Sequence, residues 1–422
     1  MRRILIYKWI NIFNETNYLD LHKSVNNYFS GSCPNFGNKL WYQGLISEIS
    51  TLENEIYYYD GKMKIEEINQ QFDLIIYPMA NIFSIEFSTG LDLLSDFFSR
   101  IKIPTFIISC GAQANSYDDL DRLVKIIGEK SQRFISTIYN TGGQFALRGN
   151  FTAEFFHKLG FNNPAVVGCP SLFQLGRNFQ IETGIVNKTD FKPSFNGKFD
   201  NCIEYLDCFT SSIFYDQDIF YDLLYNPNYF KTNSGFANNL KMIRFNDNSL
   251  KLADYLNSGR IKLIADMWDW QNDFIKENIS FSFGSRIHGT VIALLSGVPS
   301  VLVTLDSRTR EMAELYNIPH INSFNCVKPE ELYDYYCGLD FTGFNKNYVK
   351  IYDKFEKFLI ESNIVDKMNE NNDFLNRDIK DYIDPSEYTI SKNKNVFNSI
   401  LKHQNLYSDI RKLIDIERKI RR

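Results

Sequence analysis

The chain has 422 residues, which is too long for one ordinary hydrophobic core and predicts two domains with an appendage. Hydrophobic residues make up 44% of it and charged residues 23%, a balance that is typical of globular proteins and excludes an intrinsically disordered chain. The net charge of -5 argues against a dedicated nucleic-acid-binding protein, so no nucleic acid is expected among its partners.

The cysteines and the N-terminus indicate a location in the cytoplasm. Seven cysteines are scattered without a Cys-x-x-Cys pair, which suits thiols in a reducing compartment better than disulfides or a zinc site. The apolar run Ile4–Tyr7 ends at Lys8 without a cleavage site, so it predicts a first strand and not a signal peptide. No apolar run approaches the roughly 20 residues that cross a bilayer. We expect a cytoplasmic protein, or one that lies peripherally on the inner face of the cell membrane.

The first 175 residues alternate short apolar runs with amphipathic segments, which predicts a parallel sheet covered by helices. Asn150 is placed to cap one helix and Gly160 to end it. The expected strands are Ile4–Ile10, Glu55–Tyr59, Asp73–Tyr77, Thr105–Ser109, Gln144–Leu147 and Ala165–Val167. The expected helices are Leu91–Arg100, Leu120–Glu129 and Thr152–Leu159.

A polar interval rich in Asn and Lys, from about residue 176 to 198, predicts a linker to a second alternating block. The clearest unit of that block covers residues 279–306, where a strand, a helix ended by Gly297 and a second strand form a βαβ unit. Such units are parallel and right-handed. The expected strands of the block are Ile203–Leu206, Met242–Phe245, Ile261–Ala265, Ile279–Phe283 and Ser300–Leu305.

The expected fold class is therefore α/β, with two Rossmann-like domains on either side of a cleft. Residues 1–175 form the first domain, residues 176–328 the second, and residues 329–422 a charged, helical C-terminal extension. The end of the extension, residues 402–422, mixes apolar and basic side chains. Two interpretations stay open for it: a helix on an anionic membrane, or a helix packed on protein.

The strongest candidate site lies where a strand turns into a helix, at Ser285, Arg286, Ile287, His288 and Gly289. Helix-start amides and the helix dipole favour an anion at such a turn. Arg286 can bind a carboxylate or phosphate through two parallel hydrogen bonds, and His288 can exchange a proton near neutral pH. Ser285 adds a small hydroxyl, and Gly289 leaves room for a ligand to approach the backbone. An ordinary strand–helix junction is the weaker alternative.

Other candidates are weaker, and each has a structural alternative. Arg148 ends a strand at the edge of the first domain, where pairing with any acidic neighbour is equally expected. Arg308 follows the last strand, beside Asp306 or Ser307 as the helix cap. Gly111 lies at a strand end and Asn38 in the turn 35–39, which is more simply an ordinary turn. The five histidines are isolated, so no metal site is expected.

The order of these motifs resembles the polysaccharide pyruvyl transferase family. The resemblance covers roughly residues 30–325 and rests mainly on Arg286-x-His288-Gly289 with the Gly-Val-Pro that follows at 297–299. It is supported by Asn-x-Gly-Asn at 35–38, Leu-Arg before a helix and Val-Gly-x-Pro at 167–170. The chain departs from the family pattern at Gly149 and Cys169, where the family usually has acidic residues.

The resemblance implies two facing Rossmann-like domains, as in B-type glycosyltransferases, and a GT-B-like fold. It implies transfer of the pyruvyl group of phosphoenolpyruvate onto two hydroxyls of a sugar as a cyclic ketal, with release of phosphate. The acceptor would be a sugar or oligosaccharide of a cell-surface polysaccharide such as a capsule, or its lipid-linked precursor, and no cofactor would be needed. By the same resemblance His288 would be the acid, Arg286 a donor-binding residue and Arg148 the donor contact from the other domain.

Two alternatives stay open. One is a nucleotide-sugar-dependent glycosyltransferase of envelope polysaccharide biosynthesis on the same fold, whose arginines would hold a diphosphate and whose His288 would serve as base. The other is a non-enzymatic scaffold in polysaccharide assembly, with the helical extension as its contact surface. Release of phosphate from phosphoenolpyruvate, release of a nucleoside diphosphate, or neither, separates the three.

Overall fold

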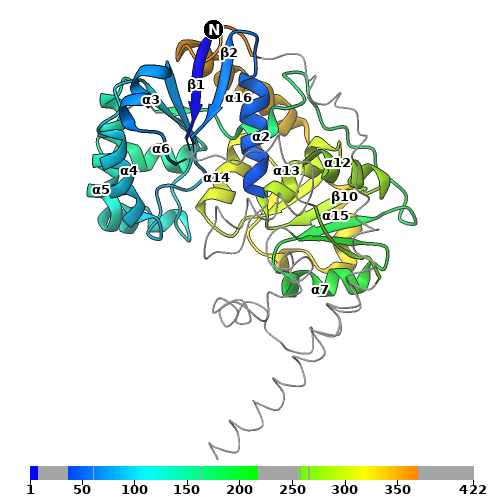
Figure 1. Cartoon of the computed structure of the whole chain (residues 1–422). Coiled ribbons are helices and arrows are strands. Elements are labelled where there is room, and N and C mark those ends of the chain that lie inside the picture. Colours follow the sequence, from blue (N-terminus) through cyan, green and yellow to red (C-terminus); the bar gives the residue numbers. More distant parts are fainter. Residues whose placement is uncertain are drawn as a thin grey trace, which may run out of the picture.

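The structure consists of two six-stranded parallel sheets, each covered by helices, with α2 (Gly37–Ile49) between the two domains (Figure 1). This confirms the predicted α/β fold class with two Rossmann-like domains. The predicted strand Met242–Phe245 and the segment 402–422 lie outside the described residues. The computed structural model describes residues 1–7, 37–59, 61–162, 164–216, 255, 258–264 and 267–368.

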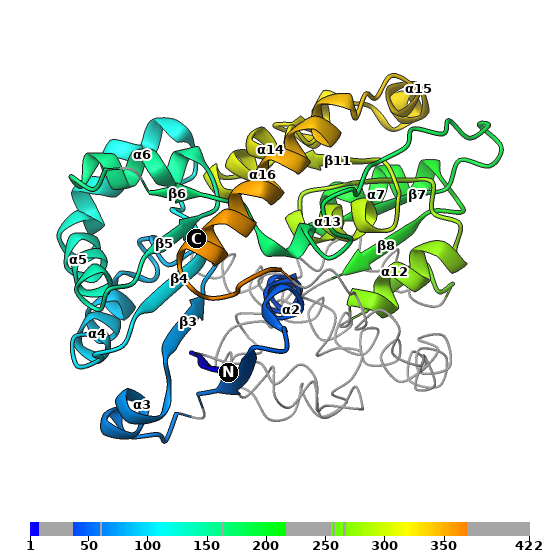
Figure 2. The same cartoon turned by 90° about the horizontal axis from the view of Figure 1, so that it is seen from above.

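The first sheet has the strand order β2-β1-β3-β4-β5-β6 and is parallel throughout. Its central strands are apolar and buried because helices cover both faces, as Figure 2 shows. The strands are β1 (Arg2–Ile6), β2 (Asn54–Tyr58), β3 (Leu74–Pro78), β4 (Thr105–Cys110), β5 (Phe145–Leu147) and β6 (Ala165–Val166). The other helices are α3 (Ile65–Gln71), α4 (Ser88–Phe98), η1 (Tyr117–Asp119), α5 (Leu120–Asn140), α6 (Asn150–Lys158) and η2 (Pro170–Leu172).

The second sheet has the order β12-β11-β10-β7-β8-β9, so the chain changes direction between β7 and β10. Ligands of open α/β sheets bind at such a switch point, beyond the carboxyl ends of the strands. The strands are β7 (Pro193–Asn196), β8 (Ile213–Asp216), β9 (Ile261–Leu263), β10 (Phe281–Gly284), β11 (Ser300–Val303) and β12 (His320–Ile321). The helices are α7 (Phe199–Cys208), α12 (Met267–Lys276), α13 (Ile287–Leu295) and α14 (Ser307–Tyr316).

The predicted strand Ile203–Leu206 is wrong, because these residues form the second half of α7. Their apolar run is too short to distinguish a strand from a helix, and the deciding signal lies in the wider spacing. The side chains that α7 buries recur at helical intervals: Phe199, Cys202, Ile203, Tyr205 and Leu206.

The predicted linker is wrong for its last residues, where β7 forms the middle of the second sheet. This strand has only one large apolar side chain, Phe195, so its sequence looks like a polar loop. The prediction also lacks β8, which pairs with β7 in parallel. Both strands are buried on both faces, so they lack the alternation of apolar and polar residues that marks a half-exposed strand.

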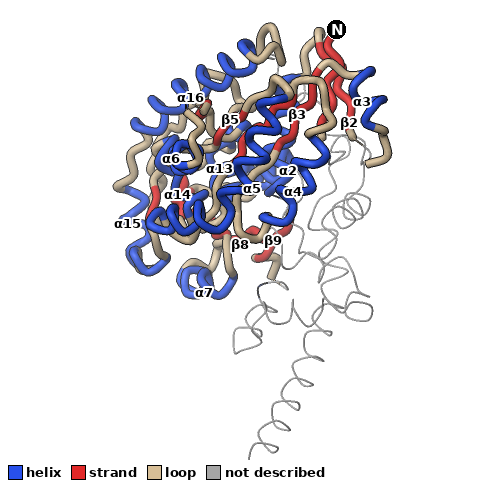
Figure 3. Tube along the Cα trace, turned by 90° about the vertical axis from the view of Figure 1, so that its left-hand side faces the viewer, coloured by secondary structure: helices blue, strands red, loops and turns tan. Residues whose placement is uncertain are grey.

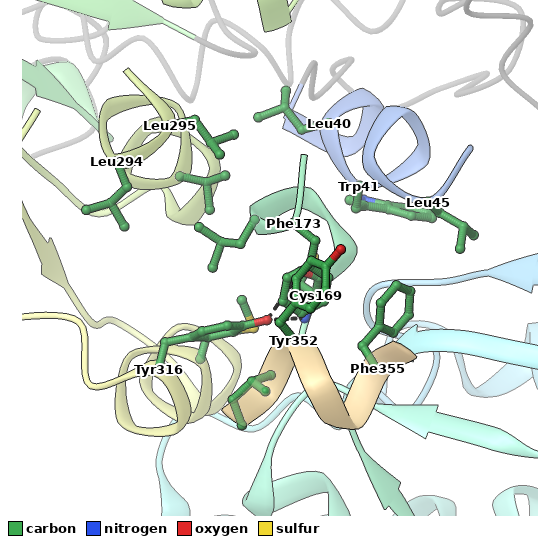
Figure 4. Packing of buried hydrophobic residues seen from close by; sticks show 14 of the residues in the cluster. Leu40, Trp41, Leu45, Cys169, Phe173, Leu294, Leu295, Tyr316, Tyr352 and Phe355 are labelled. Carbon is green, nitrogen blue, oxygen red and sulfur yellow. Dashed lines mark hydrogen bonds between the residues drawn. The ribbon is translucent and has the colours of Figure 1, made fainter. Parts of the chain in front are cut away.

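A single hydrophobic cluster joins the two domains. Figure 4 shows Trp41 of α2 and Phe173 beside Leu294 of α13 and Phe355 of α16 (Thr342–Glu361). Figure 2 shows α16 extending from the second domain to the first. There, the ring of Phe358 packs edge-on against the ring of Phe106 in β4. The shorter elements before α16 are η3 (Phe324–Cys326), η4 (Pro329–Glu331) and α15 (Leu332–Cys337). Among the described residues, no helix is both long and apolar enough to cross a membrane.

Candidate functional site

A cavity of about 160 Å³ lies between the two domains, beyond the carboxyl ends of the strands. Ala80 and Arg148 line it from the first domain. The second domain contributes the turns after β7, β10 and β11. The structure thus brings five predicted site residues together in one cavity: Arg148, Ser285, Arg286, His288 and Arg308. The other lining residues are Lys198, Ile287, Leu305, Asp306 and Thr309.

The turn between β10 and α13 is held by Asn196 at the end of β7. The Asn196 Oδ1 atom accepts a hydrogen bond from the backbone N–H of Arg286 at 2.8 Å. A Cβ atom on Gly284 or Gly289 would lie only 2.5 or 2.6 Å from the Asn196 side chain. The structure therefore places Gly289 against Asn196 and not among the residues that line the cavity. The prediction lacked Asn196, because it follows a strand that the sequence pattern does not reveal.

Arg286 is the N-cap residue of α13 and makes no side-chain cap to the helix. The amino end of α13 therefore faces the cavity with its positive dipole end. Ser285 packs against the turn that follows β7. A Cβ atom on Gly197 in that turn would lie 2.5 Å from the Ser285 Oγ atom. Gly197 has a φ of +129°, a conformation that favours glycine.

His288, in the first turn of α13, is buried at 6% exposure. Burial, and after it the positive charges of Arg148, Arg308 and Arg286 in that order, together lower the pKa of His288 to about 3. The imidazole is therefore neutral near pH 7 when the cavity holds no anion. Three guanidinium groups from two domains act on one ring, so a bound anion would change its protonation.

Arg148, between β5 and α6, has only 3% exposure. An Nη atom donates to Ser109 Oγ at 3.3 Å and contacts Cys169 Sγ at 4.0 Å. Its buried Nε atom has no hydrogen-bond partner, and it forms no ion pair within the described part of the chain. The Glu311 carboxylate is near enough for the charge of Arg148 to lower its pKa, but the two side chains form no hydrogen bond or ion pair. A buried guanidinium without a directly bound carboxylate is costly, which favours an anionic ligand at this position.

Arg308 is held at the cavity by Asp306, to which an Nη atom donates at 2.6 Å. Asp306 also accepts the Thr309 backbone N–H at 2.9 Å, so the predicted cap of α14 is confirmed. Burial raises the pKa of Asp306, but Arg308 and the hydrogen bonds from Thr309 lower it more, and the net shift is downward. Asp306 is therefore a carboxylate at neutral pH.

Lys198 is a fourth cation at the cavity that the prediction lacked. It follows directly after β7, in the interval that the sequence predicts as a linker. The Lys198 side chain is exposed and forms no ion pair with the residues that the structure describes. Once β7 is known, the position of Lys198 just after its carboxyl end, next to the switch point, identifies it as a candidate site residue.

Besides Gly289, one further predicted site residue is not among those that line the cavity. Gly111 lies behind Arg148, since a Cβ atom there would be 2.9 Å from the Ala80 carbonyl oxygen and 3.8 Å from Arg148 Cδ. Asn38 belongs to the first turn of α2, and its side chain lies outside the described residues. In the part of the chain that is described, no group of three or more His, Cys, Asp or Glu side chains is arranged to bind a metal ion.

Comparison with known proteins gives one family. A family model described as polysaccharide pyruvyl transferase matches residues 19–307. No curated protein matches the chain. The S. aureus MnaA–UDP co-structure is 10% identical, with a TM-score of 0.40 over 88% of this chain and 100% of that chain. The glycosyltransferase SnogD from Streptomyces nogalater is 8% identical, with a TM-score of 0.28 over 84% and 94%. These TM-scores are too low to establish a shared fold, so the fold class is assigned from the two sheets of the chain itself.

Proposed function

The chain belongs to the polysaccharide pyruvyl transferase family, and from that premise we propose that it transfers the pyruvyl group of phosphoenolpyruvate onto two hydroxyls of a sugar. The product is a cyclic ketal, and phosphate is released. The acceptor is a sugar of a cell-surface polysaccharide or of its lipid-linked precursor, and the reaction takes place in the cytoplasm. The observation that carries the proposal is the buried, unpaired Arg148 across one cavity from Arg286 and His288.

The charges around the cavity suit this donor. Arg148, Lys198, Arg286 and Arg308 bring four positive charges, of which Asp306 offsets one. Phosphoenolpyruvate has a carboxylate and a phosphate ester, and a phosphate ester carries about -1.5 to -2 charges at pH 7. A donor with two anionic groups needs two separated cationic contacts, and the arginines of the two domains supply them.

The size of the cavity favours a compact donor over the nucleotide sugar of the alternative function. Its volume of about 160 Å³ is below the roughly 300–1,000 Å³ of pockets for drug-sized ligands. A nucleotide sugar would have to extend well outside it. The glycosyltransferase alternative therefore receives less support from this site than pyruvyl transfer.

His288 is the proposed general acid. The donor anion offsets the guanidinium charges that lower the pKa of His288, so donor binding favours the imidazolium form. His288 then protonates the methylene carbon of the enol, which leaves an oxocarbenium-like carbon. The first sugar hydroxyl attacks this carbon and its proton returns to the imidazole. The second hydroxyl displaces phosphate and closes the ketal, and its proton leaves with the phosphate.

Incubation with candidate donors tests the proposal. With a suitable saccharide acceptor, we expect phosphate release from phosphoenolpyruvate and a ketal in the product by NMR and mass spectrometry. We also propose that no metal is required, so the activity should persist in EDTA. Release of a nucleoside diphosphate from a nucleotide sugar, without turnover of phosphoenolpyruvate, would replace this proposal by the glycosyltransferase alternative.

A further inference from the structure

A carboxylate of the second domain binds the amino end of a helix of the first. Glu311, in α14, is 1% exposed. Its carboxylate accepts the Thr152 backbone N–H at 3.0 Å and the Thr152 hydroxyl at 2.9 and 3.0 Å. Thr152 lies in the first turn of α6, so Glu311 makes the hydrogen bond that an N-cap side chain of α6 would otherwise make.

The N-cap residue of α6 itself has no side chain to do this. Gly149 occupies that position with an extended backbone at φ -171° and ψ -176°, a conformation open to any residue. A Cβ atom on Gly149 would lie 2.7 Å from the Cβ, Cγ and Oε2 atoms of Glu311. Glycine at 149 therefore makes room for a carboxylate from the other domain.

The rest of α14 packs against the first domain as well, and Figure 3 shows α14 next to α6. Ser307 donates its backbone N–H to the carbonyl of Ala114 at 3.0 Å, and Ser307 Oγ accepts the N–H of Ala114 at 2.9 Å. At the other end, the Tyr316 hydroxyl accepts the N–H of Cys169 at 3.0 Å. Glu311 lies between these two contacts.

Arg148 directly precedes Gly149, so its backbone continues into the amino end of α6, while its N–H donates to the carbonyl of Cys110. We propose that Glu311 is a positioning residue that caps α6 from the opposite domain and so holds Arg148 in place relative to Arg286. The inference rests on the anion-binding role proposed for Arg148. It adds that correct placement of this arginine requires the contact between the two domains.

A pair of substitutions separates the cap from the contact between domains. Glu311→Gly removes both. Gly149→Asp combined with Glu311→Gly restores a cap from within the first domain, because Asp is a preferred N-cap residue and Glu311→Gly also removes the Glu311 Cβ atom, which an alanine would leave 2.7 Å from the new Cβ atom at position 149. The domains remain without their carboxylate contact in this double variant. Gly149→Asp alone should be the least stable variant, since it crowds Glu311.

The measurements are the midpoint of thermal unfolding, amide hydrogen exchange and the affinity for inorganic phosphate, the product of the proposed reaction. Glu311→Gly should lower the midpoint, speed exchange at Thr152 and weaken phosphate binding about tenfold, the scale of one charged hydrogen bond. The double variant should regain the Thr152 protection and unfold at a higher midpoint than Glu311→Gly alone, while exchange in α14 stays fast and phosphate binding stays weak. Glu314→Ala, which removes a more exposed contact of α14 with Tyr117, should bind phosphate normally.

Wild-type phosphate affinity in the double variant would overturn the proposal, because a cap from either domain would then suffice. Slow exchange of α14 in that variant would overturn it as well. If Glu311→Gly does not fold, the double variant carries the test alone. Failure of the proposed anion-binding role of Arg148 gives a different result. Arg148→Ala would then leave phosphate affinity unchanged, while hydrogen exchange in α14 would still show whether Glu311 holds the two domains together.

Discussion

Two strand–helix turns with an arginine lie at the same cavity, and they differ in how the amino end of the helix is satisfied. At the start of α6, Glu311 binds the N–H of Thr152. At the start of α13, the N-cap residue Arg286 makes no side-chain cap, and the helix end faces the cavity. One helix end is thus closed by the protein itself, and the other can bind a ligand anion. Two similar sequence motifs therefore support two different roles.

Under the proposed function, this difference gives the general acid to one turn and a binding charge for the donor to the other. The turn before α13 combines a helix end, Arg286 and His288. The turn before α6 contributes the single charge of Arg148, which is buried and fixed by its contact with Ser109. Substitutions at the α13 turn should therefore affect turnover most, and the first domain should affect mainly the affinity for the donor.

His288→Ala tests the first part of this comparison and should have the largest effect. General acid catalysis contributes about 10²–10⁴-fold, so the kcat of phosphate release from phosphoenolpyruvate should fall by that order. Donor affinity should fall much less. The control is His320→Gln, an exposed histidine of β12 whose Nδ1 atom lies 2.9 Å from the Ile318 carbonyl oxygen. Full turnover in His288→Ala would show that the general acid is not His288.

Arg148→Ala tests the second part by donor affinity, and Arg286→Glu at the α13 turn gives the affinity expected when the open helix end no longer binds an anion. Loss of Arg148 should weaken phosphoenolpyruvate binding about ten- to a hundredfold, the range for one hydrogen bond between charged groups, while circular dichroism shows a folded protein. Charge reversal at Arg286 should abolish binding, because a negative charge then occupies the helix end. Arg177→Ala, an exposed arginine paired with Asp353, is the control. Calorimetry that gives unchanged affinity for Arg148→Ala would leave the first domain without a donor contact.

The turn before α13 was predictable from the sequence, and much of its surroundings was not. Arg286, His288 and Gly297 lie within one βαβ unit, so local spacing is enough to place them. Asn196 and Lys198 escaped prediction because β7 has a single large apolar residue and looks like part of a polar loop. The contact of Glu311 with α6 escaped for another reason: its partner Thr152 is 159 residues away in the sequence. Only the packing of the two domains brings them together.

The same packing explains one departure from the family pattern, Gly149, and includes a contact with the backbone of the other, Cys169. Gly149 makes room for Glu311, and Cys169 donates its backbone N–H to the hydroxyl of Tyr316. Both partners belong to α14 of the second domain. A comparison of sequence motifs treats the two departures as unrelated, whereas the structure shows that one helix contacts both positions.

Lys198→Ala should have a smaller effect than either arginine substitution, because the Lys198 side chain is exposed at the edge of the cavity. An exposed cation that donates one modest hydrogen bond contributes about two- to tenfold in affinity, so the KM for phosphoenolpyruvate should rise by that factor at unchanged kcat. Higher salt should reduce the difference from wild type. Lys102→Ala, an exposed lysine before the amino end of β4, is the control, and an equal effect there would deny Lys198 a specific role.

The smallest effect concerns the closed helix end and its dependence on pH. Burial, with a smaller contribution from the charge of Asp306, raises the pKa of Glu311 from its ordinary value of 4.5 to about 7, although hydrogen bonds from Thr152 and the charge of Arg148 act to lower it. Cys110 and Tyr117 also lie near, since the charge of Glu311 contributes to raising the pKa of each. An acid with a raised pKa in the folded state keeps its proton where the unfolded chain has lost it. Folding through Glu311 is therefore most favoured below about pH 4.5 and becomes less favoured as the pH rises to about 7.

Glu311→Gln removes this titration while it keeps an oxygen that can accept a hydrogen bond. The unfolding midpoint of the variant, relative to wild type, should therefore rise by several degrees between pH 5 and pH 7 and then stay level, because both states of Glu311 are ionised at higher pH (a shift of one pKa unit corresponds to about 1.4 kcal/mol). The matched control is Glu314→Gln on the same helix, whose side chain is 38% exposed. Scanning calorimetry over this range measures both differences. If the unfolding midpoints of Glu311→Gln and wild type change with pH in parallel, Glu311 ionises as easily in the folded protein as in water. The burial of the carboxylate that closes the α6 end would then have no influence on stability.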